Sequence, residues 1–137
     1  MFLVHLVGDI HQPLHCAERS GDQGGNGVRV TFFGQNTNLH KVWDFGIIDR
    51  RTYQWGEYVN DLEENWFSSN NIADLGGGEP ADWAWEAHQA AVGVVYALPA
   101  DLNLDGEYYE KSLPTIDRRL ALAGIRLARL LNDALWD

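Results

Sequence analysis

Two copies of one short motif, His5-x3-Asp9 and His40-x3-Asp44, stand on either side of a lone His15 near the start of the chain. Residues four apart on a helix lie about 40° apart around its axis, so both side chains of each pair point the same way. Imidazole and carboxylate groups are zinc ligands, and three of them leave a fourth position for water, as in catalytic zinc sites. A single His/Asp pair of this kind is more often a surface hydrogen bond. Two pairs and a third histidine, in a chain with only five histidines, indicate a metal site.

The composition is that of one globular domain with an acidic surface. The 137 residues are 45% hydrophobic and include six tryptophans, which is enough to build a packed core. The net charge of -10 argues against a general nucleic-acid-binding module, because such modules use Lys and Arg to neutralise phosphates. Bound divalent ions would place positive charge at the point of contact, and aromatic rings could stack on a base. The composition therefore argues against general nucleic-acid binding and permits a function that depends on bound metal ions.

The pattern of apolar residues predicts a mainly α fold, with one short strand or hairpin near residues 28–33. Helices are expected over residues 2–14, from Leu39, and over 49–66, 81–98 and 113–135. Pro13 is expected to kink or end the first helix, and the Gly- and Asn-rich segment 70–80 to form the main loop. In the helix over 49–66, a core-facing spacing is shared by Tyr53, Val59, Leu62 and Trp66.

The text around the histidines is more specific than their spacing. The stretches HLVGDIHQPLH, GDQGGNGVRVTFFG and NLHKVWDFGII resemble the zinc-dependent, single-strand-specific nucleases of the mung bean type, which belong with the bacterial zinc phospholipases C. The stretches DWAWEAH and AGIRLARLLN extend the resemblance to the C-terminus. The resemblance implies an α-helical fold with up to three zinc ions. It also implies hydrolysis of single-stranded DNA and RNA to 5'-phosphorylated products, by a secreted or periplasmic protein.

The same resemblance implies roles for individual residues. His15, His40 and Asp44 match the three protein ligands of one complete zinc site. His5 and Asp9 match two ligands of a second zinc, and Asp9 also bridges to the third. Asp9 is therefore the expected catalytic residue, because the zinc pair that it serves activates the attacking water.

The remaining ligands belong, in the family, to a preceding N-terminal half. By resemblance, residues 1–137 form a single domain equivalent to the C-terminal half, with one complete zinc site. Such a chain is expected to be a weak nuclease by itself, and to self-associate or pair with an N-terminal half. In the loop GDQGGN, Gly24 and Gly25 allow close approach of a substrate, and Asn26 is expected to donate to its phosphate or base.

Two other functions remain open from the sequence. A phospholipase C-like zinc phosphodiesterase would use the same scaffold, although the sequences GDQGGN and NLHKVWD favour a nuclease. A non-catalytic zinc-binding half-domain would carry the same ligands. Further polar and aromatic candidates are given structural roles: His11 and His88 as hydrogen-bonded histidines, Asp22 as a turn former, Cys16 as a buried thiol and Trp43 as a core residue.

Overall fold

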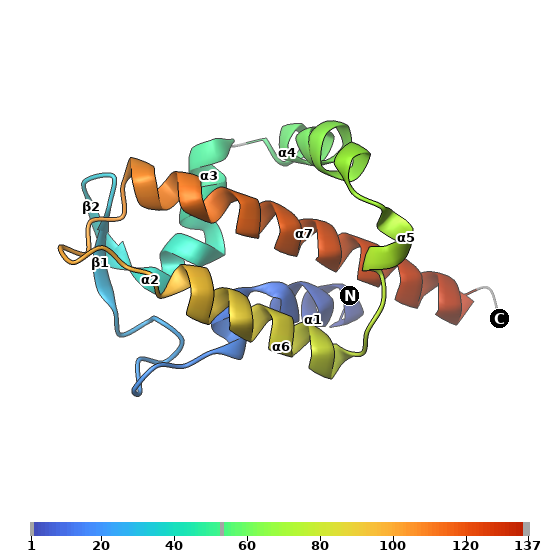
Figure 1. Cartoon of the computed structure of the whole chain (residues 1–137), viewed down its shortest axis with the longest axis horizontal. Coiled ribbons are helices and arrows are strands. Elements are labelled where there is room, and N and C mark those ends of the chain that lie inside the picture. Colours follow the sequence, from blue (N-terminus) through green and yellow to red (C-terminus); the bar gives the residue numbers. More distant parts are fainter. Residues whose placement is uncertain (1, 53, 136–137) are drawn as a thin grey trace.

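The computed structural model describes residues 2–52 and 54–135, and it is mainly α as predicted. The long helix α7 (Gly106–Leu135) runs through the molecule, with α1 (Phe2–His11) and α6 (Pro80–Ala90) along one side of it (Figure 1). On the other side lie α3 (Ile47–Arg51) and α4 (Trp55–Asp61). The buried core cluster contains residues of α3, α4 and α7 and of the segments that connect the helices, among them Val42, Ile47, Tyr58, Val95 and Ile116.

The N-terminal segment follows the expected pattern around Pro13. Helix α1 ends at His11, and the short 3-10 helix η1 (Pro13–Cys16) begins two residues later. Proline suits the first position of a helix, because its fixed φ is helical and its missing N–H would be unpaired there. Gln12 caps η1, with its side-chain oxygen accepting from the Leu14 backbone N–H. The chain therefore turns at Pro13, which brings His15 back toward α1.

The predicted strand is the first half of a hairpin. Strands β1 (Arg29–Phe32) and β2 (Gln35–Asn38) pair antiparallel, and the turn between them is formed by Phe33 and Gly34. Both turn residues have positive φ, 45° and 78°, as in the two-residue turns that match strand twist. Asn38 ends the hairpin, and its side chain accepts from the Lys41 N–H, which starts the next helix.

The helix expected from Leu39 is continuous over three segments: α2 (Leu39–Lys41), the π-helix η2 (Val42–Gly46) and α3. The helix predicted over 49–66 is wrong as a single element, because it is interrupted after Arg51. Thr52 is extended, and its hydroxyl accepts from the Gln54 N–H, an arrangement that competes with helical hydrogen bonding. The predicted core residues Leu62 and Trp66 do contact the core, whereas Val59 is 52% exposed and its neighbour Tyr58 is buried in its place. Tyr53 lies outside the described residues.

After α4 the chain continues through η3 (Leu62–Trp66), η4 (Phe67–Ser69) and α5 (Ile72–Leu75), so the predicted loop over 70–80 contains one helical turn. Glu79 and Asp82 form a capping box at the start of α6, which continues into η5 (Ala91–Val95). Helix α7 begins seven residues before the predicted start. It accommodates Pro114 because that residue is exposed, so the carbonyl that loses its partner lies near water.

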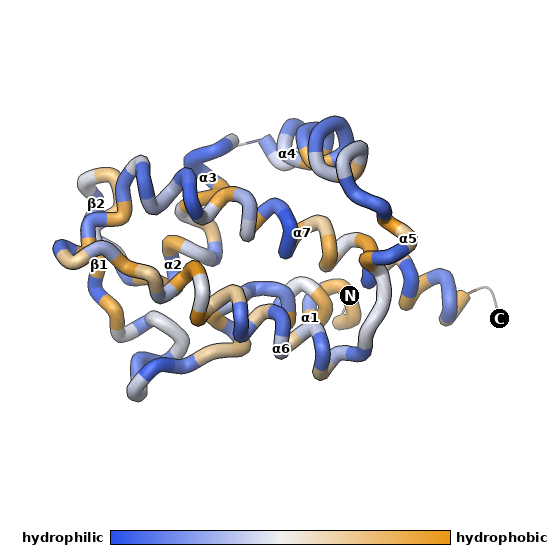
Figure 2. The backbone as a smooth tube through the Cα atoms, in the orientation of Figure 1, coloured by the Kyte–Doolittle hydropathy of each residue, from blue (hydrophilic) through white to orange (hydrophobic). Residues whose placement is uncertain are grey.

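Helix α1 presents apolar side chains to solvent. Phe2 is 83% exposed, Val4 54% and Leu6 58%, and Figure 2 shows hydrophobic residues in the first turns of this helix. Within residues 2–52 and 54–135, no helix is both long and apolar enough to cross a bilayer.

Candidate metal centre

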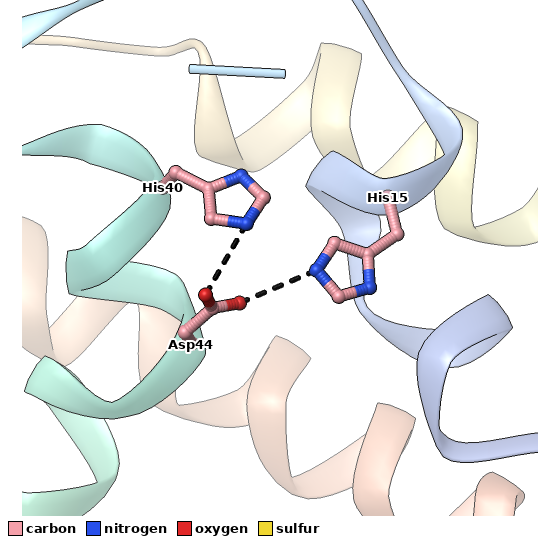
Figure 3. A group of neighbouring side chains, drawn as sticks. All are labelled: His15, His40 and Asp44. Atoms are coloured by element: carbon pink, nitrogen blue, oxygen red, sulfur yellow. Dashed lines mark ion pairs between the residues drawn. The ribbon is translucent and has the colours of Figure 1, made fainter. Parts of the chain in front are cut away.

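His15, His40 and Asp44 converge on one point, although they come from separate segments of the chain. His15 lies in η1, His40 in α2 and Asp44 in the π-helix η2. Each offers one ligand atom, and these atoms lie within 4.8 Å of one another. The Nε2 atoms of His15 and His40 lie 3.4 Å and 3.2 Å from the two Asp44 oxygens. Both rings point toward this carboxylate (Figure 3). The imidazole rings are stacked with centroids 5.1 Å apart.

The second nitrogen of each imidazole is held by an acceptor. His40 Nδ1 lies 2.7 Å from the Gly24 carbonyl oxygen, and His15 Nδ1 lies 2.8 Å from an Asp9 carboxylate oxygen. Because a carbonyl only accepts, His40 Nδ1 carries the hydrogen and Nε2 keeps its lone pair for a metal. Partners of this kind fix the tautomer and orientation of metal-binding histidines. The residues present therefore fit a cation such as zinc.

The loop that carries Gly24 packs closely against the ligand segments. Gly24 and Gly25 are buried and have φ values of +62° and +82°. A Cβ on Gly24 would lie 2.6 Å from the Leu14 carbonyl oxygen, so no other residue fits here without a shift. The structure thus gives both glycines a packing role around His40. Asn26 is exposed, and its side chain donates to the Gln23 carbonyl. Contact of these three residues with substrate stays a prediction.

Sequence reasoning missed Gln12. Its side-chain amide donates to Asp44 Oδ1 at 2.7 Å, while its oxygen caps η1. It therefore joins two ligand-bearing segments that are 32 residues apart. A polar residue directly before a helix-starting proline signals a cap, but not this second contact. Trp43, the predicted core residue, is 3% exposed and donates to the Tyr108 hydroxyl at 2.8 Å, which anchors η2 to α7.

His5 and Asp9 lie one turn apart on α1, and both are exposed. They line the same cleft as His15 and Asp44, with a volume of about 400 Å³. In this structure the Asp9 carboxylate contacts His15, which belongs to the candidate metal-binding group with His40 and Asp44. The assignment of His5 and Asp9 to a second zinc stays a prediction.

His11 is buried inside the protein and is no ligand in this arrangement. Its Nδ1 lies 2.7 Å from the Val7 carbonyl oxygen, and its Nε2 lies 2.9 Å from an Arg126 guanidinium nitrogen. Arg126 makes two bonds to Glu86, at 2.7 and 2.8 Å, and Arg119 makes a third at 3.0 Å. This buried ionic cluster joins α1, α6 and α7, and so fixes the helix that carries Asp9.

The remaining polar candidates have the structural roles expected of them. His88 Nδ1 lies 3.0 Å from the Cys16 carbonyl oxygen. The Asp22 carboxylate accepts from the Arg19 N–H and the Tyr96 hydroxyl, closing the turn. Cys16 is half-buried with its thiol directed to the Ile10 carbonyl, and burial raises the pKa of that thiol.

The burial of His11 predicts a pH-dependent stability. Burial lowers the pKa of His11 to about 4, whereas the unfolded residue titrates near 6.5. The unfolded chain therefore binds more protons between these values, and the free energy of unfolding falls as pH falls through them. Between pH 7 and pH 5, we expect the titration of His11 to lower the free energy of unfolding by about 2 kcal/mol. Urea unfolding of the metal-free protein at both pH values measures this change. In the variant His11→Gln this part of the pH dependence should disappear; an equal slope in both proteins would contradict the assignment.

Comparison with known proteins gives one consistent result. The family model for S1/P1 nuclease matches residues 1–136. Nuclease S1 of Aspergillus oryzae is 34% identical over 155 residues, which cover 96% of this chain and 52% of that protein. Endonuclease 3 of Arabidopsis thaliana is 37% identical, covering 96% and 49%, and Nuclease P1 of Penicillium citrinum is 30% identical, covering 96% and 56%. The chain spans about half the length of these curated relatives.

Proposed function

The chain belongs to the S1/P1 nuclease family. From this premise we propose that it is part of a zinc-dependent endonuclease that hydrolyses single-stranded DNA and RNA to 5'-phosphorylated products. The observation that carries the proposal is the convergence of His15, His40 and Asp44 within 4.8 Å. Two imidazoles and one carboxylate form a donor set suited to zinc, with one position left for water or substrate. We propose zinc as the cofactor because this donor set suits it and because the family resemblance implies it.

The protein's own residues prepare that centre. The Gly24 carbonyl and the Asp9 carboxylate hold the two rings with Nε2 toward Asp44, and Gln12 orients the carboxylate. Bound zinc would relieve the negative charge that develops on the phosphate oxygens at this centre, and would supply a nucleophilic water on the Asp9 side of the cleft. His5 and Asp9 would hold a second ion on the α1 side of the cleft, with Asp9 as the catalytic residue.

The net charge of -10 favours substrate binding through bound cations. An acidic surface repels a phosphate chain, and cations in the cleft would reverse this repulsion at the point of contact. Asn26 is exposed in the loop that carries Gly24, and it is the proposed donor to a phosphate or base. We assign export, to the periplasm or medium, from the family resemblance alone.

The exposed apolar side of α1 fits a further protein segment. Phe2 and Leu6 are each more than half exposed and, one turn apart, lie on the same side of α1 as Asp9. Contiguous apolar surface of this kind favours association. In the family resemblance, an N-terminal half supplies further zinc ligands, so we propose that this side of α1 takes such a half or, in its absence, a second copy.

The metal content tests the proposed centre. After dialysis against metal-free buffer, the purified chain should retain close to one zinc per chain, and a second zinc should bind only weakly. Elemental analysis measures both values. A content near zero would contradict the complete site, and three tightly held ions would show that another chain supplies the missing ligands.

Cleavage of single-stranded DNA and RNA tests the activity. With added zinc, the chain by itself should turn over slowly, because His5 and Asp9 are only part of a second zinc site, and an incomplete site lowers metal occupancy. An N-terminal half of a relative, supplied in trans, should raise the rate, and Asp9→Asn should abolish the gain. No cleavage under either condition would count against the nuclease assignment, and release of a lipid headgroup from phospholipid would favour the phospholipase alternative.

A further inference from the structure

The exposed side of α6 carries an ordered pair of aromatic rings. Trp85 is 61% exposed, and its indole lies against the His88 imidazole with centroids 5.3 Å apart and planes 15° apart. The His88 ring is held in turn by the Cys16 carbonyl oxygen, 3.0 Å from Nδ1. One face of the indole is therefore covered by a fixed ring, and its large exposure leaves the other face to a ligand.

This pair is linked directly to the metal centre. Cys16, whose carbonyl holds His88, follows the candidate ligand His15 in η1. The segment η1 packs against both α6 and η5. The same short helix thus presents His15 to Asp44 and supports the aromatic pair on α6.

The surface continues along the helix in the direction of Tyr96. Residues 85, 88 and 92 are three and four apart along the continuous helix of α6 and η5, and Tyr96 directly follows its end. Val92 is 62% exposed, and the Arg19 guanidinium lies over the Tyr96 ring, 4.3 Å from its centroid. Arg19 also donates to the Tyr96 carbonyl at 3.4 Å, so its guanidinium is held at the end of this stripe, where the Asp22 carboxylate accepts from the Tyr96 hydroxyl.

We propose that Trp85 and His88 form a stacking subsite for a nucleobase of single-stranded nucleic acid, with Arg19 placed to contact a phosphate of the same strand. This inference rests on the proposed function, since it assumes that a strand reaches the metal centre. Base stacking suits a chain of net charge -10, because it adds affinity without requiring a basic surface and accepts every base. The fixed His88 ring holds the indole in place before binding, which reduces the entropy lost on association.

Binding measurements on the zinc-loaded chain test the subsite. Fluorescence anisotropy with a labelled phosphorothioate oligonucleotide of mixed sequence would report affinity without cleavage. Trp85→Ala should weaken single-strand binding about 10-fold, and Trp85→Phe, which keeps an aromatic ring, should lose much less. Trp85→Leu is the matched control for apolar area: it should bind as weakly as Trp85→Ala. Zinc content should be equal in all four proteins.

A duplex of the same sequence supplies the second control, because paired bases cannot stack on an indole. The duplex affinity of Trp85→Ala should equal that of the unmodified chain. If the unmodified chain binds single strands and Trp85→Ala binds them equally well, the subsite is wrong and the proposed function stands. If Trp85→Leu binds single strands with full affinity, apolar contact rather than ring stacking explains the binding, and the stacking subsite is wrong. If the zinc-loaded chain binds no single strand, the proposed function itself fails.

Discussion

Replacing Asp44 by asparagine is expected to lower the zinc affinity of the chain by at least about 100-fold, because substitutions in the surrounding shell of metal sites already cost 10- to 100-fold. Both histidine Nε2 atoms face this carboxylate, which is the only anion in the group of three. Asparagine keeps an oxygen that can accept from Gln12. The variant therefore removes the charge while keeping the local hydrogen bond. Titration with zinc in competition with a chelator measures the change.

Asp49→Asn is the matched control for this experiment. Asp49 lies five residues further along the same continuous helix and is outside the group of three. The Asp49→Asn variant should bind zinc with the same affinity as the unmodified chain. Equal affinity in Asp44→Asn and the control would remove Asp44 from the site, and with it the observation on which the proposed function depends. A circular dichroism spectrum of each variant verifies that the helices remain folded.

Replacing Glu86 by alanine is expected to lower the free energy of unfolding by about 2–3 kcal/mol. Removing one partner of a fully buried ion pair costs about 3–5 kcal/mol, and the value is reduced here because the Glu86 side chain is 37% exposed. The loss arises because the Arg119 and Arg126 side chains, only 6% and 4% exposed, keep their charges without the carboxylate. Urea unfolding of the metal-free protein followed by circular dichroism measures it.

Glu107→Ala provides the comparison, because Glu107 pairs with Lys111 on the exposed surface of α7. Its removal should leave the urea midpoint unchanged, since exposed pairs contribute little. A midpoint in Glu86→Ala equal to that of this control would show that the buried cluster does not stabilise the packing of α1 on α6 and α7. Glu86→Gln should fall between the two, because it keeps hydrogen-bond acceptance for one guanidinium but not the charge.

Much of the fold could be predicted because apolar periodicity and turn residues act locally. The helix before Pro13, the strand near 28–33 and the helix from Leu39 all depend on neighbours within a few residues. The wrong predictions concern where helices are interrupted and where they start. Thr52 breaks a helix through a side-chain hydrogen bond, and Pro114 stays inside one because its position on α7 is exposed. Whether such residues end a helix depends on solvent and side-chain partners as much as on their type.

The candidate metal site could be predicted from the sequence for a similar reason. The pairs His5 with Asp9 and His40 with Asp44 share one helix turn each, so their spacing alone aligns them, and the family resemblance adds His15. The sequence by itself thus determined a mainly α chain and a set of candidate ligands. The tertiary structure alone decided which of these meet and what holds them. Gln12 crosses 32 residues to Asp44, the Gly24 carbonyl orients His40, and His11 turns inward to an arginine 115 residues away. These contacts join groups whose separation along the chain carries no periodic signal, so they exist only once the segments that carry them are packed together.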